Sequence, residues 1–84
     1  MKQKKYPLME VVWDDITSNH SWQDIEETKK ETPIRAKSIG WKIRGDGKNI
    51  TLATMLSVDE DDRVGERVII PKGCIRYSRI IERS

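Results

Sequence analysis

The chain has 84 residues, which allows one small domain, because a chain of this length buries only about 60% of its unfolded surface. Hydrophobic and charged residues each make up 36% of it, so we expect a thin core beneath a highly charged surface. The single cysteine, Cys74, excludes an intramolecular disulfide and a thiolate metal cluster, and we expect no metal and no cofactor.

The charges alternate in sign along the chain in blocks. Residues 14–31 hold six carboxylates against two lysines, and residues 59–66 hold five carboxylates against one arginine. Residues 35–48 and 67–84 each hold five bases against one carboxylate, although the whole chain is only +2. Basic and acidic surfaces should therefore be separate.

The first part of the chain predicts a strand followed by a helix. Residues 8–13 are rich in β-branched and aromatic side chains, as in a strand. Ser21, followed three residues later by Asp24, resembles a capping box, so we expect a helix from Ser21 to about Lys30. Its narrow apolar face, from Trp22 and Ile25, should lie against a barrel.

From Ile34 the sequence alternates as a strand does, and its phase changes near residues 38–40. A bulge there would place Trp41 and Ile43 on the inner face. Residues 45–48 should form a hairpin turn in which the glycines adopt positive φ, and residues 50–56 should form the returning strand.

The last third predicts a charged loop at residues 59–62 and a strand at about 67–70. A tight turn at residues 71–73 and a final strand at residues 75–81 should follow. The expected fold class is mainly β: a small five-stranded SH3-like barrel with one short helix inserted between strands 1 and 2. We expect residues 1–84 to form one domain, with residues 1–6 as a flexible basic N-terminus.

No set of residues predicts catalysis. His20 is the only histidine; Ser18 or Ser21 and Asp14 or Asp15 are near it in sequence, but these residue types are more typical of a polar helix entry. The charged loop at 59–62 does not have the ligand spacing of an EF-hand, and residues 45–48 do not have Walker spacing.

The bases and aromatic residues predict binding instead. A positive face could combine bases of the second strand with two of the last, and the tryptophans could stack on a nucleobase or anchor an interface. The alternative is that Trp13 and Trp41 belong mainly to the core and that Trp22 is the exposed one. The candidate binding residues are Trp13, Asp14, Ser18, His20, Trp22, Lys42, Arg44, Arg76 and Arg79, with Arg35 and Lys37 also on the second strand.

Three segments carry a resemblance: Val12-Trp13-Asp14-Asp15-Ile16-Thr17-Ser18-Asn19-His20-Ser21-Trp22, Ser38-Ile39-Gly40-Trp41 and Ile69-Ile70-Pro71-Lys72-Gly73-Cys74-Ile75. With them the chain resembles short accessory proteins encoded in tailed-phage genomes, over most of residues 8 to 81. The resemblance implies a phage or prophage origin and action by binding; it transfers no catalytic residue.

We therefore expect a non-enzymatic binding protein that occupies a host protein, in this way countering host defence. Two other hypotheses are a protein that sequesters a small anionic, for example cyclic, nucleotide and a small nucleic-acid-binding module. The expected location is the cytoplasm, because no stretch approaches the ~20 apolar residues of a membrane span. The segregated charges favour a homodimer in which a basic edge pairs with an acidic one.

Overall fold

The computed structural model describes residues 6–16, 21–58 and 62–83. Most of these residues are in strands, so the mainly β class is confirmed. The elements in chain order are β1 (Leu8–Asp15), α1 (Ile25–Thr28), β2 (Ile34–Gly45), β3 (Asn49–Leu56), β4 (Val64–Pro71), the 3₁₀ turn η1 (Lys72–Cys74) and β5 (Ile75–Glu82).

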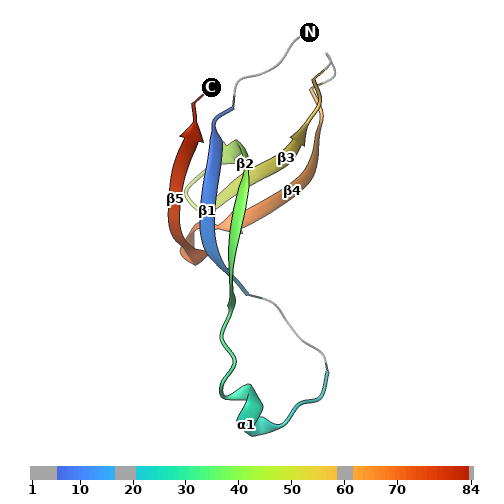
Figure 1. The fold of residues 1–84 in the computed structure, drawn as a ribbon, viewed down its shortest axis with the longest axis vertical. Helices are drawn as coiled ribbons and strands as arrows, with labels where there is room; N and C mark the ends of the chain where they lie inside the picture. The colour runs from blue at the N-terminus through green and yellow to red at the C-terminus, as the bar shows by residue number, and fades with distance from the viewer. Residues whose placement is uncertain (1–5, 17–20, 59–61, 84) are drawn as a thin grey trace.

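The five strands form one antiparallel sheet in the order β4-β3-β2-β1-β5. In Figure 1, β5, β1 and β2 lie side by side, while β3 and β4 run at an angle to them. Among the described residues no ladder joins β4 to β5, so the sheet is open at these two edges. The prediction of five strands is confirmed, with β4 three residues longer at its start than the sequence indicated.

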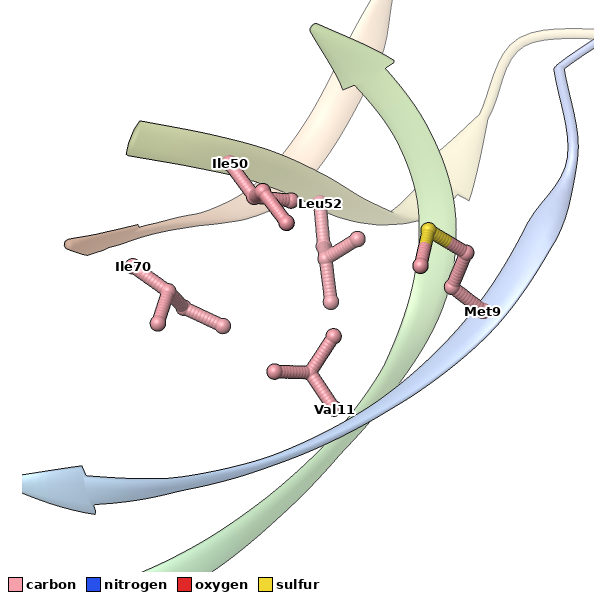
Figure 2. Packing of buried hydrophobic residues seen from close by; sticks show 5 residues of the cluster. All are labelled: Met9, Val11, Ile50, Leu52 and Ile70. Carbon is pink, nitrogen blue, oxygen red and sulfur yellow. The ribbon is translucent and has the colours of Figure 1, made fainter. Parts of the chain in front are cut away.

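A small core lies between β1, β3 and β4. It consists of Met9, Val11, Ile50, Leu52 and Ile70, with Trp13, Val68 and Ile75 packed against it while partly exposed. Figure 2 shows the side chains of Val11 and Leu52 directed toward each other. Full burial of such a side chain contributes about 1.5–3 kcal/mol, so these few residues hold the sheet together.

The predicted inner face of β2 was wrong. Pairing with β1 is continuous from Leu8↔Trp41 to Asp15↔Ile34, so there is no bulge at residues 38–40. The register changes only between Lys42 and Arg44, against β3. Because the alternation is unbroken before that point, Gly40 lies opposite Met9 on the core side, and Trp41 lies half-buried on the other side.

The helix is much shorter than predicted, and it does not lie on the sheet. Only Ile25–Thr28 is helical; Asp24 is the N-cap but makes no side-chain cap hydrogen bond, and no residue of the helix is buried. A helix of four residues is not stable by itself, and this one gains no packing. Within the described residues, no helix has the length and apolar character needed to cross a membrane.

The segment between β1 and β2 gives the molecule an elongated shape. In Figure 1, α1 lies at the far end of the molecule from the sheet. The principal extents are 56 × 23 × 20 Å, and the radius of gyration is 16.2 Å. A compact domain of this length would have a radius of gyration of about 12 Å. We call residues 21–33 the arm.

The turn between β2 and β3 is built by a carboxylate rather than by glycine geometry. No described glycine has a positive φ, which corrects the prediction for residues 45–48. Instead, Oδ1 of Asp46 accepts hydrogen bonds from the backbone N–H groups of Lys48 (2.8 Å) and Asn49 (2.7 Å). These two bonds lower the pKa of Asp46, because they favour its charged form.

Candidate functional site

The structure places the predicted binding residues on several different surfaces. Arg76, Arg79 and Asp14 lie together on the side of the sheet away from the core, whereas Trp22 lies in the arm. Ser18 and His20 lie outside the described residues. The remaining three, Trp13, Lys42 and Arg44, belong to neither group, as shown below.

Asp14 binds one arginine from each neighbouring strand. Its Oδ1 lies 3.0 Å from Nε of Arg35 on β2, and its Oδ2 lies 3.2 Å from Nε of Arg76 on β5. Arg35 is the direct antiparallel partner of Asp14, so strand pairing itself brings the two side chains together. Asp14 therefore holds two guanidinium groups on one surface.

Glu10, four residues before Asp14 on β1, also contacts one base from each neighbouring strand. Its Oε2 lies 3.1 Å from Nε of Arg79 on β5, and its Oε1 lies 3.8 Å from Nζ of Lys37 on β2. Because Glu10 and Asp14 are four residues apart, their side chains point to the same face of the strand. We call the surface formed by Glu10, Asp14, Arg35, Lys37, Arg76, Tyr77 and Arg79 the arginine face.

An irregularity in β5 completes this face. β1 pairs Val12 with Tyr77 but Trp13 with Ile75, so Arg76 is the extra residue of a bulge. In a regular strand, Arg76 and Arg79 would point to opposite faces, because three residues separate them. The bulge allows both guanidinium groups to reach carboxylates on the same face of β1.

The exposures of these side chains make the face electropositive. The side chains of Glu10 and Asp14 are only 12% and 20% exposed, whereas those of their four basic partners are 51–60% exposed. The carboxylates thus lie beneath the bases, and the set carries four positive and two negative charges. Tyr77, which is 51% exposed, lies on the same face between the two arginines of β5.

Lys42 and Arg44 do not join the arginine face. Lys42 is on the opposite phase of β2 from Arg35 and Lys37, and its backbone N–H donates to the carbonyl oxygen of Pro7 at 2.9 Å. Arg44 lies near the turn at the other end of β2, with its Nη2 3.3 Å from Oδ2 of Asp46. The bulge predicted at residues 38–40 would have put Lys42 on the same face as Arg35 and Lys37; the continuous pairing of β1 with β2 shows that it lies on the other face.

Trp13 packs against the core rather than forming a binding surface. It is partly buried beside the core residues, and its indole Nε1–H donates to Oγ of Ser38 at 3.0 Å. That hydrogen bond satisfies the only polar atom of the ring. The alternative that the sequence left open for Trp13, a core position, is therefore what the structure shows.

The arm carries exposed apolar side chains among charged ones. Every described residue from Ser21 to Arg35 is exposed. Trp22 is 101% exposed, and Ile25 and Ile34 are 70% and 67% exposed. Asp24, Glu26, Glu27 and Glu31 outnumber Lys29 and Lys30, so the arm is acidic. Trp22 is thus the exposed tryptophan, as the sequence indicated.

A shallow depression of about 490 Å³ lies where the arm meets the arginine face, lined by Asp14, Thr32, Pro33, Arg35 and Arg76. The described residues contain no group of three or more His, Cys, Asp or Glu side chains that could hold a metal ion. The chemistry on this surface is ion pairing and hydrogen bonding by guanidinium groups.

Sequence reasoning missed Glu10, because a carboxylate in a strand does not show which bases it will meet.

Compared with models of known protein families, with curated protein sequences and with solved structures, the chain has no match.

Proposed function

We propose that this protein is a non-enzymatic, phage-derived binding protein that occupies a host protein through its arm and thereby counters host defence. Its sheet serves as the scaffold, as an SH3-like partly open barrel would. The strand order β4-β3-β2-β1-β5, the long connection between β1 and β2 and the 3₁₀ turn before β5 support that fold.

The observation that carries the proposal is the exposure of Trp22. A tryptophan buries about 150–250 Å² when it is covered, and tryptophan is enriched among the residues that dominate binding energy at protein interfaces. Trp22 is fully exposed in the single chain, and the nearby Ile25 is 70% exposed. Covering both would release the water that now surrounds them, which a partner protein can do and a small anion cannot.

The charges of the arm define the kind of partner. Four carboxylates and two lysines accompany Trp22 in residues 21–33, so the arm presents an apolar anchor with an acidic rim. The complementary surface is an apolar pocket with basic residues around it, since such charges steer association and exclude wrong partners.

The test compares the loss of an exposed aromatic ring on the arm with the same loss on the sheet. Wild type, Trp22→Ala and Tyr77→Ala are used as bait in a bacterial host lysate, and a retained protein is purified and titrated by calorimetry. Trp22→Ala should weaken binding about 30-fold or more, as removal of an interface hot spot does. Tyr77→Ala, which removes a half-exposed ring elsewhere, should stay within about threefold of wild type.

Thermal melts provide the folding control, because Trp22 is exposed and its removal should leave the melting temperature unchanged. Equal binding by Trp22→Ala and wild type, or no saturable partner, would refute the proposal. Light scattering at micromolar concentration on the same samples checks the homodimer expected from the sequence, whose mass would be twice that of one chain.

A further inference from the structure

We propose that the arginine face is a second binding site, which takes the phosphate backbone of a single-stranded nucleic acid while Tyr77 stacks on a base. This site is independent of the arm. It is carried by three observations: the way in which the carboxylates hold the arginines, the distance over which the bases are spread, and the exposed ring between them.

The carboxylates hold the arginines in place but leave N–H donors of each guanidinium group available for a ligand. Arg35, Arg76 and Arg79 each contact a carboxylate through Nε. In the part of the chain that the structure describes, the ion-pair contact of each of these three residues is made by Nε, and so are the hydrogen bonds of Arg35 and Arg79 to the carboxylates. Each guanidinium can therefore still donate two N–H groups to a phosphate, in the bidentate geometry that suits this anion. Anchoring through Nε also reduces the entropy lost on binding.

The bases are spread along a strip rather than gathered around one point. The two carboxylates that hold them are Glu10 and Asp14, which are four residues apart on β1, or about 13 Å. One phosphate can reach the group around Asp14 or the group around Glu10, but not both. A ligand that uses the whole strip must carry several phosphates in a row, which favours a polynucleotide over a mononucleotide.

Tyr77 favours a single strand over a duplex. It pairs with Val12, which lies midway between Glu10 and Asp14 on β1, and the residue is 51% exposed. Single-strand-binding proteins combine such a charged track with aromatic rings on which bases stack, without regard to sequence. The bases of a duplex are already stacked on one another and cannot use the ring.

The charge count sets the expected strength and salt response. Four bases and two carboxylates give the face a net charge of +2. Binding should thus be modest, and stronger at low salt. If three or four phosphates are contacted, the logarithm of the affinity should fall with the logarithm of salt concentration with a slope of about −2 to −3, since each single-strand contact contributes about −0.7.

The experiment measures fluorescence anisotropy of labelled ten-nucleotide dT and rU strands between 20 and 200 mM NaCl. Arg76→Gln and Arg79→Gln should each weaken binding at least fivefold and make the slope shallower by about 0.7. The matched control is Arg44→Gln, which removes the same charge from an exposed arginine outside the face and should stay within twofold. Tyr77→Ala should weaken binding about tenfold. Melting temperatures confirm that each variant is folded.

Other outcomes would overturn the site. Equal losses in Arg44→Gln and Arg79→Gln would show that only net charge acts, and no binding of either strand at 20 mM NaCl would show that the face has no such function. ATP or cyclic AMP binding as tightly as the ten-nucleotide strand would identify a mononucleotide as the ligand, and tighter binding of a duplex would contradict stacking on Tyr77. Trp22→Ala should bind the strand as wild type does, which separates this proposal from that for the arm.

Discussion

Arg76 and Arg79 reach carboxylates on the same face of β1, although they are three residues apart in β5. The bulge at Arg76 makes this possible, because it shifts the alternation of the strand by one residue. Exposed ion pairs such as these typically contribute about 0–1 kcal/mol each to stability. Their role here is therefore better described as positioning: β1 supplies the carboxylates that hold bases from both of its neighbours.

The core is small enough that one of its side chains should decide whether the domain folds. Leu52 is fully buried, whereas Ile69 on the adjacent strand is 63% exposed. Leu52→Ala should lower the free energy of unfolding by about 2–5 kcal/mol, through lost burial and the cavity left behind. Ile69→Ala, which also truncates a large aliphatic side chain, should cost less than about 1 kcal/mol. Urea denaturation of both variants measures this, and similar losses would mean that the core is elsewhere.

Gly40 has no room for a side chain. A Cβ at this position would lie 2.7 Å from the carbonyl oxygen of Ala53 and 3.3 Å from Cβ of Leu52, so β2 and β3 would have to separate. Gly40→Ala should therefore destabilise the domain by about 1–3 kcal/mol, as overpacking does. Gly73→Ala is the matched control, because no atom lies within 4 Å of a Cβ there. Thermal melts should show a clear decrease only for Gly40→Ala; an unchanged melt for that variant would contradict the close approach of the strands.

Asp46 should contribute to the acid sensitivity of the fold. Its pKa is lowered below the ordinary value of 3.8 by the backbone hydrogen bonds from Lys48 and Asn49. A carboxylate with a lower pKa in the folded state stabilises the fold above its unfolded pKa, and this contribution is lost as pH falls through the folded pKa. The relevant window therefore lies below about pH 4.

Asp46→Asn isolates this effect, because the amide oxygen can still accept both backbone hydrogen bonds but cannot be protonated in this range. Denaturation at pH 6 and pH 2.5 should show a smaller loss of stability for the variant than for wild type, since the other carboxylates titrate in both proteins. An identical loss in the two would show that Asp46 is not perturbed.

The strands could be predicted from the sequence because each one leaves a local signal. Alternation at residues 50–56 and the Pro71-Lys72-Gly73 break before residue 75 place β3, η1 and β5 without information from elsewhere in the chain. The register of a strand leaves no such local signal, because it is a relation between two strands. The sequence contains no sign that Gly40 rather than Trp41 lies on the core side; that follows from pairing with β1.

The difference between local signals and strand pairing also explains which residues of the candidate site could be predicted from the sequence. Arg76 and Arg79 were identified from the sequence, but the role of Glu10 depends on the pairing of strands that are far apart in the chain, and Lys42 was grouped with Lys37 only because a bulge was wrongly predicted between them. The helix was overestimated for a related reason. Ser21 and Asp24 carry a local start signal, but a helix of ten residues needs a surface to pack on, and the arm has none within the described residues.

The exposure of the arm separates two kinds of sequence change. Substitutions at Val11, Leu52 or Ile70 alter whether the chain folds, because these side chains are fully buried. Substitutions in residues 21–33 remove nothing from the core, because every residue of the arm is exposed, so they should leave the sheet intact. Under the proposed function, recognition and foldability could therefore evolve independently in this chain, because an arm of different sequence between β1 and β2 would leave the buried residues of the sheet unchanged.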